Sequence, residues 1–375
     1  MRTEGAGALL RALRECSLPH LKTLSVEDNI LGAQVKGELR DVVGVQAGGA
    51  GGRDGEESGE GARKSGLQLE EALRSFLWLF FLRTLHLSAQ EMGDKGVKLL
   101  SRGLQAGRIP SLRVLSLRSS SISEEGAKVF AEALQTHCLP FLESLDLSSN
   151  RSIGDKGMVA LAGAAKGRAM RSVQILDLSI TGIREEGAVA LADALKGRAI
   201  PFLRTLGMYC NEAGDEGVGG LAEAAKAGAL RCLQSLDLSW NYVRSGGAKA
   251  IAGVLREGGF RYLQKLDLAD NEIWDDGVEA HAEVLKGGFG GSLKEVILRE
   301  NDFGSEAGEV LRASAPLGCT LLLKFDEEGE EEKGIERLRG MDEENSYGEN
   351  GDFEMAGDSG VDESDLSGWT DRMRA

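Results

Sequence analysis

The glycine-rich segment Ser58–Ser65 (SGEGARKS) is the part of this 375-residue chain whose composition comes nearest to a phosphate-binding loop. Such a loop has glycine at its first and sixth positions, so that backbone N–H groups can approach a phosphate, followed by lysine and a hydroxyl residue. Here Ser58 and Arg63 occupy the two glycine positions, and no strand is predicted before them. The segment therefore predicts no nucleotide site, and we expect no cofactor.

Histidine and cysteine could supply a metal ligand or a nucleophile. Such chemistry needs several of these side chains at ligand spacing, or a nucleophile paired with a base. The histidines are dispersed, and no Cys-x-x-Cys occurs among the five cysteines, an odd number that is typical of reduced thiols. We expect no metal site, no catalytic residue and no enzyme activity. The residues concerned are His20, His86, His137 and His281, and Cys16, Cys138, Cys210, Cys232 and Cys319.

Four carboxylates do form a pattern. Asp146, Asp177, Asp237 and Asp267 recur at intervals of 31, 60 and 30 residues, with Gly207 at the middle of the longest interval. This regularity requires a repeated structural unit that returns each carboxylate to an equivalent position. On neighbouring strands the like charges would repel, which is tolerable where they are solvated and useful where a basic partner binds.

The repeated unit reads Leu-x-x-Leu-x-Leu-x-x-Asn, then a short turn, then Gly-x-x-x-Leu-x-x-x-Leu. From Leu82 onward its leading apolar residue recurs every 30 residues, with one interval of 31. A unit of this size cannot bury its own leucines, so successive copies must stack and bury them between neighbours. The leading residues are Leu21, Leu82, Leu112, Leu142, Val173, Leu203, Leu233, Leu263 and Leu293.

One copy shows how the unit folds. Leu266 and Leu268 have the period of two of a strand, and Asn271 follows where the chain must turn. Asp275 is placed at the N-cap of a helix that ends at the glycines beginning with Gly287. The asparagine side chain can form hydrogen bonds with backbone groups of the turn that have no partner in the sheet. Copies without asparagine should therefore have a weaker turn. Those copies carry Gln90, Ser120 and Thr181.

The wording of the repeats resembles the ribonuclease-inhibitor-like subclass of the leucine-rich repeat family. Segments such as Phe202–Leu206 and Leu236–Asn241, and the Asp-x-Gly and Ala-Leu-Lys-Gly that follow, carry the similarity, which covers most of residues 4–325. The resemblance implies an α/β leucine-rich repeat solenoid, a horseshoe with a parallel sheet on its concave face and helices on its convex face.

The composition predicts two regions, a repeat domain at residues 1–325 and a disordered tail at 326–375. The tail holds 18 acidic and 5 basic residues, a net charge of −13, so the first region carries only −3 of the total of −16. The chain begins on the helix of a repeat whose strand is absent, so the domain starts in mid-repeat. The long interval before Leu82 predicts a flexible insert at about residues 46–65; a degenerate extra repeat is the alternative.

Charge and hydropathy exclude two classes of partner. A near-neutral repeat region with an acidic tail would repel phosphate, so we expect no nucleic-acid binding. The longest apolar run, Phe76–Leu82, is far shorter than the roughly 20 residues of a membrane-spanning helix, and no segment has the pattern of a signal peptide. We expect no membrane association and a cytoplasmic or nuclear location.

The concave face is the predicted binding surface. Beside the carboxylates we expect Tyr209 and Trp240 to be exposed, a composition typical of an interface anchor. The expected partner is a protein with a basic surface. The alternative is that the carboxylates recur only because Leu-Asp-Leu-Ser is the common consensus sequence of the repeat and was copied by duplication. The candidate partner-binding residues are Asp146, Asp177, Tyr209, Asp237, Trp240, Asp267 and Arg299.

The leading functional hypothesis is a non-catalytic protein–protein interaction scaffold. One alternative is a GTPase-activating protein of the Ran-activating type, a class that resembles this chain in its repeats, length and acidic tail; no catalytic arginine or asparagine is assigned by motif. Another is a fragment of a nucleotide-binding leucine-rich repeat receptor, with which the mid-repeat start agrees. Actin-capping repeat proteins are a more distant alternative. The sequence predicts no oligomeric state.

Overall fold

The structure is a computed structural model of the whole chain, and it describes four ranges of residues. All of them belong to the unit Met1–Phe325. The predicted insert at about 46–65 and the acidic tail at 326–375 lie outside the described residues, as does the start of the chain, and they stay predictions. The described ranges are 23–25, 82–88, 92–107 and 109–323.

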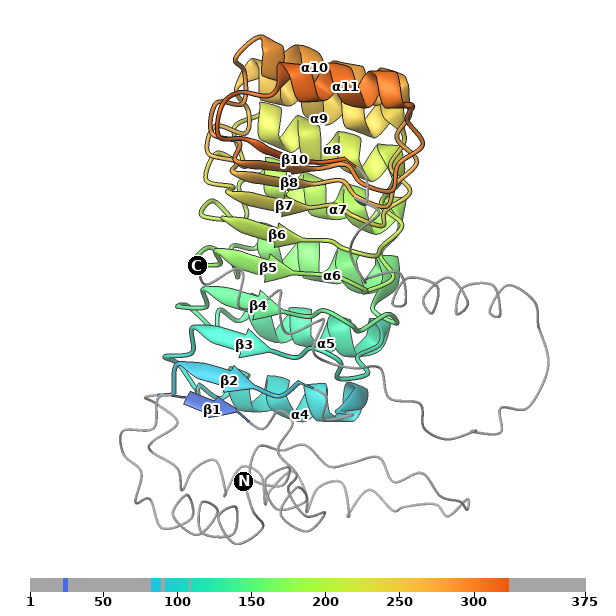
Figure 1. Ribbon diagram of the computed structural model, residues 1–375. Helices are drawn as coiled ribbons and strands as arrows, with labels where there is room; N and C mark the ends of the chain where they lie inside the picture. Colours follow the sequence, from blue (N-terminus) through green and yellow to red (C-terminus); the bar gives the residue numbers. More distant parts are fainter. Residues whose placement is uncertain (1–22, 26–81, 89–91, 108, 324–375) are drawn as a thin grey trace, which may run out of the picture. The chain divides into compact units, whose positions relative to one another are not determined.

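Among the described residues, ten strands form a parallel sheet on one face of this unit (Figure 1). Its strands are three residues long and follow one another in sequence order, so each repeat contributes one strand. β1 pairs directly with β2, with Thr23 beside Thr84. The strands are β1 (Thr23–Ser25), β2 (Thr84–His86), β3 (Val114–Ser116), β4 (Ser144–Asp146), β5 (Ile175–Asp177), β6 (Thr205–Gly207), β7 (Ser235–Asp237), β8 (Lys265–Asp267), β9 (Glu295–Ile297) and β10 (Thr320–Leu322).

Helices cover the opposite face, one between each pair of strands from β2 onward (Figure 1). The predicted α/β leucine-rich repeat solenoid is therefore confirmed. The helices are α4 (Gly93–Gln105), α5 (Glu124–Gln135), α6 (Gly154–Lys166), α7 (Glu185–Lys196), α8 (Gly214–Lys226), α9 (Ser245–Glu257), α10 (Asp275–Lys286) and α11 (Ser305–Ser314).

One continuous hydrophobic core runs between the two layers. The leading residues from Leu82 to Leu293 are at most 5% exposed, as the stacking argument predicts. The single interval of 31 residues arises because the turn after Asn150 contains one extra residue. The carbonyl oxygen of Arg151 comes so close to Gly182 that an added Cβ would lie 2.2 Å from it, and the φ angle of Gly182 is +67°. Only glycine fits there without strain.

The asparagine column forms the predicted ladder between repeats. Asn150 Oδ1 accepts hydrogen bonds from the backbone N–H groups of Ser120 and Ile122, both at 3.0 Å. Its Nδ2 donates to the carbonyls of Leu117 and Leu147 at 2.9 and 2.8 Å. The amide thus joins its own repeat to the preceding one. Equivalent bonds are made by Asn211, Asn241, Asn271 and Asn301.

The two hydroxyl residues in this column make fewer such bonds. Ser120 Oγ donates to the carbonyls of Leu87 and Arg118, and Thr181 Oγ1 donates to that of Leu178 at 2.6 Å. Neither hydroxyl has a recorded bond from a backbone N–H of the described residues, whereas the asparagines accept one or two. The turn bonds are therefore fewer where asparagine is missing, in agreement with the sequence.

The prediction that Asp275 caps its own helix is wrong. The N-cap of α10 is Trp274, which makes no side-chain cap bond, and Asp275 Oδ1 instead accepts from the N–H of Gly304 at 2.6 Å, before α11. Asp155 acts in the same way on the next helix, with bonds from Arg184 and Gly187 at 2.8 and 2.9 Å. A carboxylate at a helix start therefore satisfies the free N–H groups of the following repeat, and the capping links neighbouring repeats.

His281 is the polar member of an otherwise apolar core column on the helices. It is 2% exposed, and its Nδ1 lies 3.0 Å from the carbonyl of Gly277, while its Nε2 has no hydrogen-bond partner among the described residues. Burial lowers the pKa of His281 below its usual value of 6.5, so the imidazole is neutral. The equivalent residues in the other repeats are Leu100, Phe130, Leu161, Leu191, Leu221, Ile251 and Leu311.

Replacing His281 by leucine should raise the free energy of unfolding by about 1–2 kcal/mol at neutral pH, because a buried acceptor without a partner is removed. As the pH falls below 6.5 the unfolded chain takes up a proton first, so the unmodified chain loses stability there and His281→Leu does not. Urea unfolding at pH 7.5 and 5.5 measures both effects. The exposed His137, replaced by leucine, is the control. Equal pH dependence in the unmodified chain and His281→Leu would contradict this assignment.

Candidate partner-binding surface

The strand face, meaning the face of the sheet opposite the helices, brings the four predicted carboxylates into one row. Asp146 lies beside Asp177 on β4 and β5, and Asp237 lies beside Asp267 on β7 and β8. Gly207 occupies the position between Asp177 and Asp237 on β6. The row therefore consists of two adjacent carboxylate pairs separated by one strand without a side chain, as the sequence predicts.

Each carboxylate is oriented by the chain that follows it. Asp146 Oδ1 and Asp177 Oδ1 accept from the backbone N–H two residues ahead, both at 2.9 Å, and Asp237 and Asp267 repeat the bond at 3.0 and 3.1 Å. Such side-chain to backbone bonds define an Asx-type turn. The hydroxyls of Ser148 and Ser239 add a bond of 2.6 Å to the same oxygen atoms. The side chains are thus held at the end of each strand.

The two inner members of the row are buried rather than solvated. Asp177 is 9% exposed and Asp237 is 5% exposed. Burial, followed by the neighbouring charge of Asp146, raises the pKa of Asp177 to about 7. Burial and then the charge of Asp237 raise the pKa of Asp267 to about 7, and burial also raises the pKa of Asp237. An alternating sequence pattern places these residues on the side of the strand away from the core, so it does not reveal their burial.

Tyr209, Trp240 and Arg299 lie in the turns that leave β6, β7 and β9, and all three are half-buried, so the prediction that Tyr209 and Trp240 are exposed is wrong in degree. Burial, and then the neighbouring Cys210 and Asp270, raise the pKa of the Tyr209 hydroxyl to about 12. Asp237 and Arg299 also act electrostatically on Tyr209, and Arg299 acts on Asp267. The structure thus gathers Tyr209, Asp237, Asp267 and Arg299, while Asp146 and Asp177 form a neighbouring pair.

The turn after each strand holds one residue in the left-handed conformation. Trp240 has φ +55° and Ile180 has φ +54°, values that bulky and β-branched side chains rarely adopt. The conformation belongs to the shared geometry of the turn, because the same position is left-handed in every repeat from Ser119 onward, including the two in which Ser120 and Thr181 replace the asparagine that follows. Its members are Ser119, Ser149, Ile180, Cys210, Trp240, Asp270 and Glu300.

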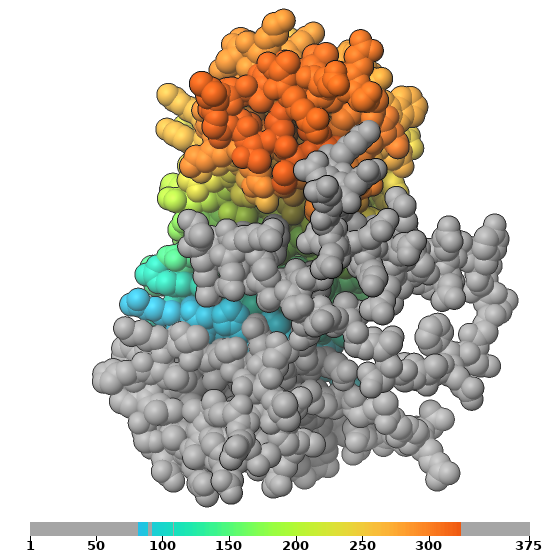
Figure 2. Space-filling view, viewed as in Figure 1, coloured from blue at the N-terminus to red at the C-terminus, as the bar shows by residue number. Residues whose placement is uncertain are grey.

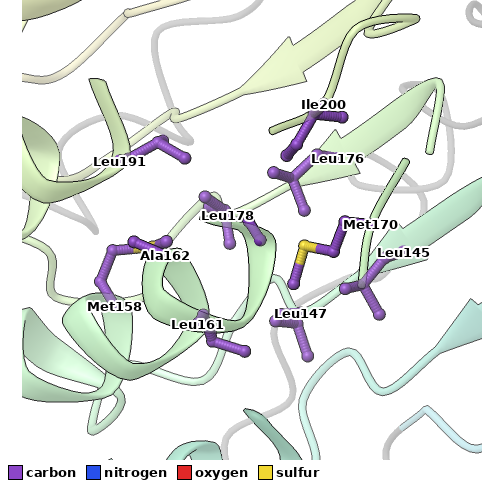
Figure 3. A pocket seen from close by; sticks show the side chains of 11 residues that line it. Leu145, Leu147, Met158, Leu161, Ala162, Met170, Leu176, Leu178, Leu191 and Ile200 are labelled. Carbon is purple, nitrogen blue, oxygen red and sulfur yellow. The ribbon is translucent and has the colours of Figure 1, made fainter. Parts of the chain in front are cut away.

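The cavity within the described repeats is too small for a ligand. The space between α6, α7 and the strands β4 and β5 measures about 10 Å³ and is lined by apolar side chains such as Met158 and Leu176 (Figure 3). Small-molecule sites are typically some 300–1,000 Å³ with a few convergent polar groups. In the space-filling view the C-terminal repeats form a continuous packed surface (Figure 2). The described part of the chain also contains no group of three or more His, Cys, Asp or Glu side chains that could hold a metal ion.

A second set of exposed side chains was not predicted from the sequence. Phe141, Phe202 and Tyr262 each stand immediately before a leading apolar residue and are 54%, 56% and 53% exposed. In the sequence, an aromatic residue occupies this position in every second repeat, which gives a period of about 60 residues. The 30-residue pattern does not show this longer period.

The repeats, the single parallel sheet and the helix-covered opposite face define a leucine-rich repeat protein. Three segments of the chain match the Leucine Rich repeat family, at residues 138–162, 229–252 and 261–280. These matches and the repeated strand-and-helix unit support a leucine-rich repeat family. No curated protein matches the chain in sequence.

Similar solved structures include a chain of the yeast Rad7 and Elc1 complex, which is 14% identical with a TM-score of 0.31; the match covers 69% of this chain and 70% of that one. An internalin (inlF) of Listeria monocytogenes is 17% identical with a TM-score of 0.34, over 66% of this chain and 76% of that one. The ectodomain of the Arabidopsis thaliana receptor kinase GASSHO1/SCHENGEN3, solved with CASPARIAN STRIP INTEGRITY FACTOR 2, is 15% identical with a TM-score of 0.35, over 65% and 33%.

Proposed function

We propose that this leucine-rich repeat protein is a non-catalytic interaction scaffold that binds a protein partner with a basic surface through the strand face. The row of oriented carboxylates beside Tyr209 and Trp240 is the observation that carries the proposal. A solenoid presents a wide surface that is already ordered, which lowers the entropic cost of binding. None of the helices that the structure describes is both long and apolar enough to span a membrane.

The chemistry of the carboxylates supports a cationic partner. Asp177 and Asp237 are buried, and a lysine or arginine placed over them would favour their ionised forms. Because the pKa of Asp177 is about 7, binding such a group would release protons near neutral pH. The affinity for a basic partner should therefore rise between pH 6 and pH 8.

The half-buried aromatics support an anchor beside this row. Tyr209 and Trp240 stand on neighbouring repeats: Tyr209 follows β6, the strand that carries Gly207, and Trp240 follows the adjacent β7. Aromatic side chains that are already held by their surroundings lose little conformational freedom on binding, which is why they dominate the energetics of many interfaces. The gap at Gly207 gives a partner side chain room between the two carboxylate pairs.

Affinity capture with the intact chain, followed by measured dissociation constants, tests the proposal. Replacing Tyr209 and Trp240 together by alanine should weaken binding by a factor of about 30 or more, since each anchor typically contributes 1–2 kcal/mol or more. The matched control replaces Tyr242 and Trp274, which are 58% and 61% exposed on other turns. Unchanged affinity of the first variant, with the fold intact by circular dichroism, would remove the strand face from the interface.

The same proposal includes the finer assignments made from the sequence: the ribonuclease-inhibitor-like subclass, a cytoplasmic or nuclear location, and a repeat domain at 1–325 followed by an acidic tail at 326–375. The alternatives of a Ran-type GTPase-activating protein and a receptor fragment stay open predictions. A GTP hydrolysis assay with a panel of small GTPases separates the first alternative from a scaffold, because a scaffold leaves the hydrolysis rate unchanged.

A further inference from the structure

The entry edge is the row of residues that stand immediately before the leading apolar residue of each repeat. Aromatic and small residues alternate along it from Phe141 to Ser292. The Ser172 hydroxyl donates to the carbonyl of Pro140 at 2.9 Å, which shows that successive repeats are in contact here. The row is Phe141, Ser172, Phe202, Cys232, Tyr262 and Ser292, in which the three aromatics are exposed and the three small residues half-buried.

The spacing of the aromatics suits one kind of extended ligand. Strands of a parallel sheet lie ~4.8 Å apart, so aromatics on alternate repeats lie roughly 10 Å apart. Ser172 and Cys232, which are small and half-buried, stand between successive aromatics, and we call these two positions notches. A polyproline II helix advances ~3.1 Å per residue, or about 9.3 Å for three residues, so every third side chain would meet a notch. A β-strand repeats every ~6.8 Å and would fall out of register.

The charge of this edge is positive. Arg168, Arg171 and Arg198 are exposed and lie beyond the ends of α6 and α7, and no ion pair to a described carboxylate is recorded for any of them. Arg168 and Arg198 occupy equivalent positions of consecutive repeats, both with positive φ, so they stand beside one another. These arginines flank Phe141 and Phe202, the first two aromatics of the row.

The neighbouring acids do not neutralise the arginines. Glu143 is paired with Arg113, Glu223 with Lys196 and Glu257 with Lys226. Lysines in the last turns of the helices also complement the helix dipoles, which accounts for them without a ligand. Arg168, Arg171 and Arg198 are outside those turns, so the dipole argument does not cover them.

We propose that the entry edge binds an acidic, proline-rich segment of a partner protein in the polyproline II conformation. Prolines or other apolar residues at every third position would sit in the notches beside Ser172 and Cys232, between the aromatic rings, as aromatic-lined grooves hold such helices elsewhere. Carboxylates of the segment would pair with Arg168, Arg171 and Arg198, where the fork of guanidinium N–H groups suits a carboxylate. Tyr262, over which Arg261 stacks at 5.9 Å, would end the row.

A nucleic acid is the other anionic polymer to weigh. The carboxylate row on the adjacent strand face and the net charge of −16 would repel a polyanion that extends beyond the edge. A short acidic peptide carries fewer charges and needs only the edge itself. The observations therefore favour the peptide, and an oligonucleotide serves as a competitor in the test.

The test is a fluorescence-polarisation titration of the full chain with a labelled synthetic peptide that has proline at every third position and glutamate between. A scrambled peptide of the same composition checks the period. The test variant replaces all three aromatics by serine (Phe141→Ser, Phe202→Ser and Tyr262→Ser). Serine is chosen because it occupies the same position of the repeat at Ser172 and Ser292. The matched control is Tyr242→Ser with Trp274→Ser, and thermal unfolding confirms that both variants fold.

The periodic peptide should bind at least about ten times more tightly than the scrambled one, and the triple variant should lose at least about tenfold in affinity. Arg168→Glu with Arg198→Glu should lose a similar amount, while the control and Tyr209→Ala with Trp240→Ala should bind as the unmodified chain does. Equal binding of the two peptides, or full affinity of the triple variant, would overturn the proposal. So would displacement of the peptide by a single-stranded oligonucleotide at lower concentration than the unlabelled peptide requires.

Discussion

Replacing Asn271 by alanine should lower the free energy of unfolding by about 3–5 kcal/mol, the largest effect expected of a single substitution in this fold. Asn271 Oδ1 accepts from the backbone N–H groups of Asn241 and Val243, each at 2.9 Å. Its Nδ2 donates to the carbonyls of Leu238, Leu268 and Ala269. Alanine leaves all of these groups buried without this partner, and water cannot easily replace it because Asn271 is only 7% exposed.

Urea unfolding monitored by circular dichroism measures the loss of stability. A second substitution separates the contribution of the accepted hydrogen bonds from that of the donated ones. Asn271→Asp keeps an acceptor for Asn241 and Val243 but removes the donated bonds, so it should fall between alanine and the unmodified chain. Thr181→Asn adds a ladder residue where one is missing and should increase stability. If Asn271→Ala costs less than about 1 kcal/mol, the ladder does not hold the repeats together.

The leucine pattern predicted the fold because each leucine of the repeat is buried in the core. The positions of the strand, the turn and the helix follow from the spacing of these leucines. Leu263, Leu266 and Leu268 are all fully buried, as their spacing requires. The asparagine ladder was equally predictable, since Asn271 stands where backbone groups lack ladder partners. A 30-residue period predicts those features of burial and hydrogen bonding that are the same in every copy of the repeat.

The period does not capture contacts that cross from one copy to the next. Asp275 was assigned to its own helix because a carboxylate at a helix start suits either helix, and only the stacking geometry directs it to Gly304. Asp177 is buried although the alternation along its strand places it on the side away from the leucine core, so the pattern within one strand does not report its burial. The aromatics at Phe141 and Phe202 repeat over two copies, and a single-copy pattern hides them.

Replacing Asp177 by asparagine should stabilise the protein by about 1–3 kcal/mol at pH 8 and have little effect at pH 4. The pKa of this carboxyl is about 7 in the folded protein and 3.8 as its ordinary value, so the folded state binds the proton more tightly than the unfolded state does. The contribution of Asp177 to stability therefore falls as the pH rises from about 4 to 7, and the cost of its buried charge is complete above pH 7. An asparagine Oδ1 can still accept the 2.9 Å bond from the Ser179 N–H.

The measurement is the free energy of unfolding at pH 8, 7, 6 and 5, made in the His281→Leu background because the neutral histidine has the opposite dependence on pH. The gain from Asp177→Asn should shrink steadily as the pH falls. Glu186→Gln removes an exposed carboxyl of α7 and should change stability little at any of these values. Parallel curves for Asp177→Asn and its background would mean that Asp177 is solvated in the folded protein. The strand face would then carry an ordinary surface charge there, and the proton release expected on binding a basic partner would vanish with it.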